Sequence, residues 1–281
     1  MSAKLADSEL SSFNASPAGK IVELSSPLME VLRRAMEISA RSDGAFDVTC
    51  RPVLQLWKQA GKAGRLPDET ALRDALQRVG YTKIKLRETG AEKQTEGVSV
   101  DLGGIAKGYG IDRALEAIRD SGCEGGLVDV GGDIRCFGRS RSGRKWRIGI
   151  RNPFDPRSEK MLAVAALDDG AVCTSGNYFR FTEIDGRRYS HIVDPRTGRP
   201  VDAAPSVTVV APTAITADAW ATALSVLGAD GLARLEKEEG VEAMMIVGGA
   251  ENAEVRMTPG MEKLLVEPPT LPAEGNRSAD E

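Results

Sequence analysis

The chain has 281 residues, of which 37 are lysine or arginine and 41 are aspartate or glutamate, so its net charge is -4 and its isoelectric point is near 5.4. Hydrophobic residues make up 41% and charged residues 28%, as in ordinary globular proteins. The acidic balance gives no support to binding of nucleic acid or of an anionic membrane surface. The length suffices for a well-buried core, in one large domain or two small ones.

Targeting signals and cysteine pairs are not apparent. No run of 18 apolar residues is present, so we expect no membrane-spanning helix. The first nine residues lack the basic start and apolar stretch of a secretory signal, so a cytoplasmic protein is expected for the chain as given. We expect the four cysteines to be reduced thiols packed as small hydrophobes, because no C-x-x-C pair or zinc-type spacing connects them.

In the first hundred residues the pattern alternates between helices and short strands. Ser26 and Pro27 begin a helix whose apolar residues recur on one face and which ends near Ser42. An amphipathic segment follows at 52–57, and a helix at 67–79 is stopped by Gly80. Strands are expected at 21–24, within 43–49, at 81–86 and at 98–102, with a polar turn at 90–97.

The strand at 98–102 leads into a glycine-rich turn at 103–110, and a helical period then continues until Gly122 closes it. Strand, glycine turn, lysine and helix are the parts of an anion cradle, in which backbone N–H groups face phosphate oxygens and Lys107 adds positive charge. The Walker A spacing is absent. The alternative is that the glycines only allow close packing of helix on sheet.

A strand at 126–130 precedes a second glycine pair, Gly131 and Gly132, beside acidic residues. Residues 134–138 and 146–150 predict a hairpin, and residues 171–179 carry a Ser-Gly-Asn run without the G-x-S-x-G context of a serine nucleophile. The remaining expected elements are strands at 161–167, 205–211 and 243–247, a helix at 230–239, and a disordered tail at 267–281.

His191 is the only histidine of the chain. Asp194-Pro195 and Thr197-Gly198 after it have turn chemistry, so we expect a hairpin with His191 on its first strand. An imidazole exchanges protons near neutral pH, so this residue is either a hydrogen-bonded structural histidine or a general acid or base.

An alanine-rich helix is expected at 216–224, and it places Asp218 and Thr222 four residues apart on one face. A carboxylate and a hydroxyl are hard oxygen ligands that suit Mg²⁺. The alternative is that Asp218 only interacts with the positive end of the helix dipole.

Five motifs occur in one order along the chain: 43–49 (DGAFDVT), 101–112 (DLGGIAKGYGID), 128–133 (VDVGGD), 190–200 (SHIVDPRTGRP) and 216–224 (TADAWATAL). Together they resemble the ApbE family, the FAD:protein FMN transferases, over roughly residues 1–265. The resemblance implies an α+β fold with largely antiparallel sheets flanked by helices, in one domain covering 1–266. Trp220 departs from the family pattern, in which a small residue is more usual, and it either packs behind the helix or narrows the pocket.

The resemblance also implies transfer of FMN from FAD to a threonine or serine hydroxyl of an acceptor protein, with Mg²⁺ required and AMP released. It assigns His191 as the catalytic residue, Asp218, Thr222 and the carbonyl of Ala106 as metal ligands, and Lys107, Asp129, Gly131, Gly132, and Thr174 or Ser175 as FAD-site residues.

The implied acceptor is a flavoprotein subunit of a membrane redox complex, and the compartment is periplasmic, with or without a lipid anchor, if an upstream signal segment precedes the chain. Two other functions stay open from the residues themselves. One is an FAD pyrophosphatase that passes FMN to water, and the other is a non-catalytic FAD-binding protein.

Overall fold

The computed structural model describes residues 5–155, 157–176, 181–201 and 204–271. Its centre is a six-stranded sheet in the order β13-β12-β11-β8-β5-β4, and each neighbouring pair of strands is antiparallel. Its strands are β4 (Gly126–Val130), β5 (Asp133–Phe137), β8 (Gly170–Gly176), β11 (Ser206–Ala211), β12 (Glu242–Val247) and β13 (Glu254–Met257).

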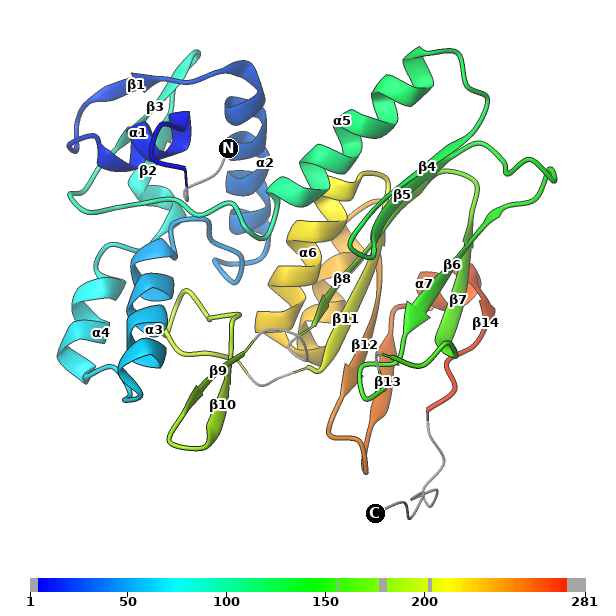
Figure 1. The fold of residues 1–281 in the computed structure, drawn as a ribbon. Coiled ribbons are helices and arrows are strands. Elements are labelled where there is room, and N and C mark those ends of the chain that lie inside the picture. Colours follow the sequence, from blue (N-terminus) through cyan, green and yellow to red (C-terminus); the bar gives the residue numbers. More distant parts are fainter. Residues whose placement is uncertain (1–4, 156, 177–180, 202–203, 272–281) are drawn as a thin grey trace.

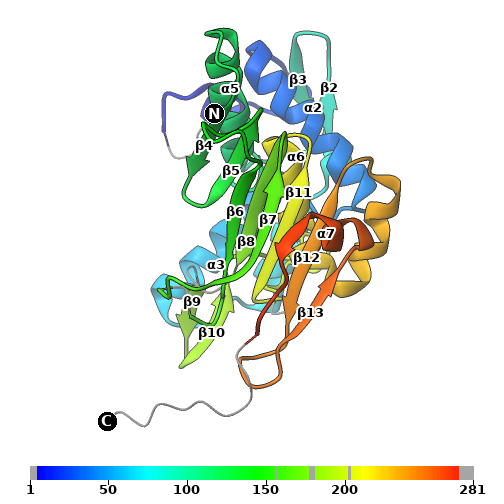
Figure 2. The same cartoon turned by 90° about the vertical axis from the view of Figure 1, so that its right-hand side faces the viewer.

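Both faces of this sheet are covered. Helices α5 (Ala106–Asp120) and α6 (Ala214–Leu227) lie on one face, and a second antiparallel sheet with α7 (Pro259–Leu264) lies on the other (Figures 1 and 2). Alternate residues of a strand point to opposite faces, so Cys173 packs beneath α6 whereas Val172 packs against the second sheet. The second sheet consists of β6 (Trp146–Arg151), β7 (Met161–Leu167) and β14 (Leu265–Glu267).

The first hundred residues form a helical layer beside α6, with a small sheet at its edge (Figure 1). Its helices are α1 (Glu9–Ala15), α2 (Ser26–Arg41), α3 (Arg51–Ala63) and α4 (Glu69–Leu76), and its strands are β1 (Ile21–Glu23), β2 (Ile84–Leu86), preceded by the 3₁₀ turn η1 (Tyr81–Lys83), and β3 (Gly90–Lys93). A hairpin of β9 (Phe181–Ile184) and β10 (Arg187–Ser190) packs on α3, and the 3₁₀ segment η2 (Ala229–Lys237) follows α6.

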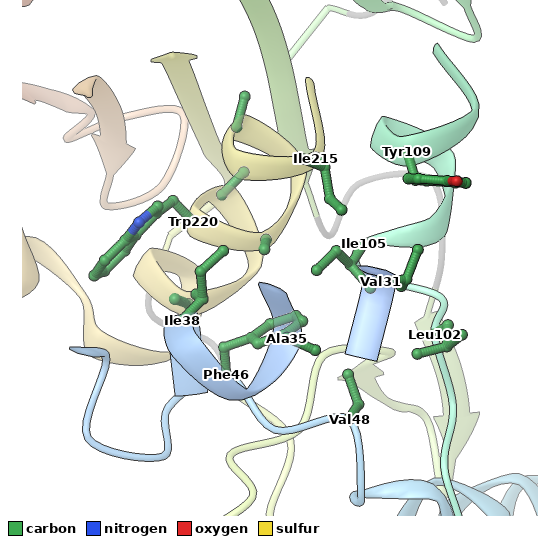
Figure 3. Packing of buried hydrophobic residues seen from close by; sticks show 14 of the residues in the cluster. Val31, Ala35, Ile38, Phe46, Val48, Leu102, Ile105, Tyr109, Ile215 and Trp220 are labelled. Atoms are coloured by element: carbon green, nitrogen blue, oxygen red, sulfur yellow. The ribbon is translucent and has the colours of Figure 1, made fainter. Parts of the chain in front are cut away.

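Helix α6 is the most enclosed helix of the described chain, because the central sheet lies on one side of it and α2 and α5 lie on others. Alanine is common in it, which lets all these layers approach closely. Trp220 is fully buried in the core that α2 and α6 share, so it packs behind the helix and does not narrow a pocket (Figure 3). Val31, Ala35 and Ile38 of α2 belong to the same cluster (Figure 3).

The expected α+β fold with largely antiparallel sheets is confirmed. The hairpin expected from 134–138 and 146–150 is wrong, because β5 pairs with β4 and β8 whereas β6 pairs with β7 in the other sheet. The segment between β5 and β6 therefore connects two layers. The polar turn expected at 90–97 is also wrong in its first half, since β3 lies at the centre of the small sheet.

Residues 98–102 and 43–49 form no strand. The two segments meet in a single parallel bridge between Cys50 and Ser99, beside which the amide of Asp101 donates to the Val48 carbonyl at 2.8 Å. The side-chain amide of Asn14 pairs with the backbone of Val100, at 2.6 Å to its N and 2.9 Å to its O. The segment expected at 52–57 is part of the longer helix α3. The hairpin of β9 and β10 was not predicted from the sequence. Its turn is nevertheless an Asp-Gly pair, Asp185-Gly186, which is typical of tight hairpins, and both φ angles are positive.

All four cysteines are free thiols, and Cys136 and Cys173 are buried as expected. Cys50 is only partly buried and Cys123 is exposed, so the expected packing as a small hydrophobe is wrong for Cys123. None of the helices in the described ranges is long and apolar enough to cross a bilayer. The amide of Thr270 still donates to the Leu162 carbonyl at 2.9 Å, and most of the predicted tail, residues 272–281, lies outside the described ranges. The domain boundary at 266 stays a prediction.

Gly108 of α5 offers a direct test of this packing. A Cβ there would lie 2.2 Å from the Ala214 carbonyl oxygen and 2.8 Å from the Ile215 Cα, whereas a Cβ at Gly110, two residues on, would meet nothing within 4 Å. We expect Gly108→Ala to lower the free energy of unfolding by about 1–3 kcal/mol, or more, through overpacking. Gly110→Ala should raise it by about 0.5–1 kcal/mol. Urea denaturation measures both, and equal stability of the two variants would contradict the packing described here.

Candidate functional site

One large cavity of about 1380 Å³ lies where the helical layer, the central sheet and the second sheet meet. A drug-sized ligand fits in 300–1,000 Å³, so this cavity has room for a dinucleotide. All ten residues assigned from the sequence line it: Ala106, Lys107, Asp129, Gly131, Gly132, Thr174, Ser175, His191, Asp218 and Thr222. The fold thus brings together residues that are far apart in the chain, while their individual roles stay predictions.

The glycine-rich turn before α5 lies directly against α6. A Cβ on Gly104 would be 2.9 Å from the Thr222 hydroxyl, and the amide of Gly108 donates to Asp218 Oδ2 at 3.0 Å. Close packing therefore accounts for Gly104 and Gly108, but it is packing against helix α6 and not against a sheet, as the alternative had expected. The same packing places the start of α5, with Ala106 and Lys107, beside the helix face that carries Asp218 and Thr222.

Asp218 is a buried carboxylate at the base of the cavity. Burial, and next the nearby charge of Asp133, raise the pKa of Asp218 to about 7. Among the described residues no cationic side chain forms an ion pair with it, because Lys107, the nearby lysine, is bound to Asp133. A buried carboxylate that accepts the Gly108 amide and has no cationic side-chain partner among the described residues is suited to bind a positive ion.

Thr222 lies one turn further along α6, and Ala106 is the first residue of α5. The Thr222 hydroxyl and the backbone of Ala106 therefore lie at the same cavity wall as the Asp218 carboxylate. Within the described ranges, no cluster of three His, Cys, Asp or Glu side chains could hold a metal by itself. A cation here would thus be bound by the Asp218 carboxylate, by neutral oxygens such as a hydroxyl and a backbone carbonyl, and by oxygens of the substrate or of water. Mg²⁺ prefers such a set of ligands.

Lys107 and Asp133 form an ion pair inside the cavity. Burial lowers the pKa of Lys107, but the bond to Asp133 and that carboxylate's charge outweigh it and leave the pKa above its ordinary value. The other carboxylate oxygen of Asp133 accepts the amide of Thr174 at 3.0 Å, which ties β5 to β8. The lysine therefore stays protonated and is held at the cavity wall, where it can meet a phosphate.

Gly131 and Gly132 form the two-residue turn between β4 and β5, with φ angles of +63° and +89° that only glycine adopts easily. Asp129 Oδ1 accepts the amide of Gly132 at 2.8 Å. That N–H group is thus already used within the turn, and it is not a free donor for a phosphate in this conformation. Neither glycine has an atom within 4 Å of its would-be Cβ, so a ligand can approach the bare backbone.

Thr174 and Ser175 lie near the end of β8, where both border the cavity. The hydroxyl of Thr174 is 2.9 Å from that of Thr208 on β11, so it is already engaged. Ser175 is half-buried and faces the same cavity. Asn177, which the sequence places after them, lies outside the described residues.

His191 lies at the exposed edge of the cavity. It comes directly after β10, and the expected hairpin around it is reduced to a single bridge between Val193 and Pro200. The turn is nevertheless fixed, because Asp194 accepts from the amide and the guanidinium of Arg196, each at 2.9 Å. A ligand in the cavity and a molecule approaching from solvent can therefore both reach this imidazole.

Sequence reasoning missed several residues of the cavity wall. Asp133 was quoted within a motif but given no role, and the same holds for Asp47, whose carboxylate accepts from Thr49 and from the amide of Tyr81 at 2.7 Å. Burial raises the pKa of Asp47 despite these bonds. Arg151 and Met161, on strands of the second sheet, lie in no motif and offered no signal.

Comparison with known proteins agrees with this architecture. The sequence pattern described as "ApbE family" matches residues 1–245. The chain belongs to the ApbE family. A FAD:protein FMN transferase of Klebsiella pneumoniae is 32% identical over 270 residues, which are 92% of this chain and 76% of that protein.

Solved structures of the ApbE family share the fold. The flavin transferase ApbE from Vibrio cholerae superposes with a TM-score of 0.83 at 32% identity, covering 94% of this chain and 85% of that one. The ApbE protein from Thermotoga maritima gives a TM-score of 0.84 at 30% identity, covering 95% and 86%.

The buried charge of Asp218 allows a test of the cation site. Its pKa is higher in the folded chain than the ordinary 3.8, so its ionisation costs stability progressively as pH rises from about 4 past 7. At pH 8 without metal, Asp218→Asn should therefore unfold at an equal or higher temperature than the natural chain. Millimolar Mg²⁺ should raise the melting temperature of the natural chain but not that of the variant.

Asp74→Asn, at an exposed position of α4, serves as the control and should keep the Mg²⁺ effect. Stabilisation of the Asp218→Asn variant by Mg²⁺ to the same extent would show that the cation binds elsewhere.

Proposed function

We propose that this ApbE family chain is a Mg²⁺-dependent transferase that moves FMN from FAD to a threonine or serine hydroxyl of an acceptor protein. The observation that carries the proposal is the single cavity in which His191, Lys107, Asp218 and the two glycine turns all meet. The relatives' activity, FAD:protein FMN transfer, supports the same reaction here. The acceptor proposed is a flavoprotein, such as a subunit of a membrane redox complex.

The reaction exchanges the phosphoanhydride bond of FAD for a phosphate ester on the acceptor. The acceptor oxygen attacks the phosphorus that carries the riboflavin, the bond from that phosphorus to the bridging oxygen breaks, and AMP leaves with this oxygen. The acceptor hydroxyl loses its proton in the process. The protein therefore has to hold a pyrophosphate, compensate its growing negative charge and accept a proton.

Lys107 supplies a fixed positive charge for the pyrophosphate. Its ammonium group is oriented by Asp133, and the carboxylate is itself anchored by the Thr174 amide, so the lysine is positioned before substrate arrives. The turn at Gly131 and Gly132 allows the phosphates to approach the backbone closely because no Cβ is in the way.

Asp218 and Thr222, with a backbone carbonyl at Ala106, are the residues proposed to hold Mg²⁺. The bound ion would neutralise charge on the pyrophosphate oxygens as the leaving group departs. Asp218 is suited to this because its charge is buried without a cationic side chain to balance it.

His191 is the proposed general base. Its place at the exposed edge of the cavity lets the hydroxyl of a large acceptor reach the imidazole while FAD occupies the interior. Water reaches the same edge, which is why hydrolysis of FAD to FMN and AMP is the competing reaction to test.

Replacing the base separates binding from turnover. We expect His191→Ala to lower kcat about 10²- to 10⁴-fold, the range of a lost general base, while the dissociation constant for FAD changes less than twofold. Flavin fluorescence titration and AMP release measure the two quantities. Arg199→Ala, an exposed residue of the same turn that pairs with Glu69, should behave like the natural chain. Unchanged turnover in the His191 variant would contradict the assignment of His191 as the general base.

The reaction itself is tested with FAD, Mg²⁺ and a peptide that carries an acceptor threonine. We expect release of AMP and a peptide heavier by FMN, both measured by mass spectrometry. AMP without labelled peptide would indicate a pyrophosphatase, and bound FAD without AMP would indicate a non-catalytic flavin-binding protein.

A further inference from the structure

The N-terminus of α6 is capped by another helix. The side chain of its own N-cap residue, Thr213, accepts from no backbone N–H of the first turn and lies instead 2.6 Å from the Thr216 hydroxyl. The first N–H groups of a helix lack acceptors within that helix. Here the carboxylate of Asp112, on α5, accepts from Ala214 N at 2.8 Å and from Ile215 N at 2.9 Å.

Asp112 is itself held in place by Arg135 on β5. The guanidinium donates to Asp112 Oδ1 at 2.7 Å, and the two side chains are only 10% and 6% exposed. A buried pair with this many bonds has little freedom to rotate or shift. The cap is thus fixed to the central sheet as well as to α5.

A second contact joins the same two helices one turn away. Gly108 lies four residues before Asp112 on one face of α5, and Asp218 lies four residues after Ala214 on α6. The amide of Gly108 donates to Asp218, while Asp112 holds the start of α6. Two points spaced by one helical turn fix both the rotation of α6 and its position along its axis.

We propose that Asp112 is the positioning residue of the cation site formed by Asp218 and Thr222. By capping α6 it sets where these two side chains lie relative to Ala106 on α5. Asp112 does not line the cavity, so it positions these side chains through α6, while its charge also helps to raise the pKa of Asp218. The inference rests on the proposed function, since it presumes that these residues bind Mg²⁺.

A positioning role differs measurably from a merely structural one. Loss of any helix cap lowers stability, but the affinity of a distant metal site stays the same. Loss of a group that orients metal ligands typically weakens metal binding 10- to 100-fold in protein that is still folded. Magnesium affinity of the folded chain is therefore the quantity to measure.

The test titrates Mg²⁺ alone into the full chain by calorimetry. Asp112→Asn keeps the shape of the side chain and removes its charge and one acceptor. Because that change leaves Arg135 buried without its partner, a second variant combines Asp112→Ala with Arg135→Met and removes both buried charges. Asp68→Ala is the matched control, since Asp68 caps α4 in the same way, with bonds to Thr70 N at 2.8 Å and Ala71 N at 2.9 Å.

We expect the Mg²⁺ dissociation constant to rise about tenfold or more in the folded Asp112 variants and to stay within twofold of the natural chain in Asp68→Ala. The Mg²⁺ concentration for half-maximal FMN transfer should rise in parallel, and excess Mg²⁺ should restore most of kcat. Unchanged Mg²⁺ affinity in either Asp112 variant overturns the inference.

Asp218→Asn in the same titration separates this failure from failure of the proposed function. The cation assignment is wrong if the natural chain does not bind Mg²⁺, or if Asp218→Asn binds it equally well. In either case the role inferred for Asp112 is also wrong.

Discussion

The backbone contact between the starts of α5 and α6 is the constraint on which the rest of the site depends. Gly108 has no Cβ, and the Ala214 carbonyl lies where that atom would be. With any side chain at this point the helices would move apart, and the Gly108 amide would no longer reach Asp218. The glycine turn before α5 would then also lose its position against Thr222. Because Gly108 has no Cβ, the residues proposed to bind the phosphates and those proposed to bind the cation can lie on the same wall of the cavity.

Charge balance around this contact distinguishes Asp218 from its neighbours. Three acidic side chains, Asp112, Asp133 and Asp218, are buried around the first turns of α5. Asp112 is paired with Arg135 and Asp133 with Lys107, whereas Asp218 has no cationic partner among the described residues. Burial raises the pKa of all three carboxyl groups, and it raises that of Asp218 to about 7. A buried carboxylate of this kind is either protonated or balanced by a bound positive charge, and the cation proposed for this site would supply that charge.

How much of this was predictable depended on whether the signal was local. Turn chemistry and helix period gave the start of α5, the Gly131-Gly132 turn and the face shared by Asp218 and Thr222, because each depends on residues within a few positions. Strand pairing depends on distant partners, so the local sequence of residues 134–150 could not show that β5 and β6 belong to different sheets. The same limit hid Asp112, whose role comes from Ala214, about a hundred residues away. It also hid Asn14, whose side-chain amide pairs with the backbone of Val100, 86 residues away.

The proposed catalytic groups are distributed over parts of different rigidity. Lys107, Asp133 and Asp218 belong to helices and strands bonded to one another across the core, which suits groups that must hold a charged pyrophosphate in one geometry. His191 lies instead on a connection beyond β10, fixed by its own turn and exposed at the edge of the cavity. A base that must meet the hydroxyl of another protein has to be reachable from outside, whereas the pyrophosphate must be shielded from water. The position of His191 at the exposed edge, apart from the buried acids, suits both demands of the proposed reaction.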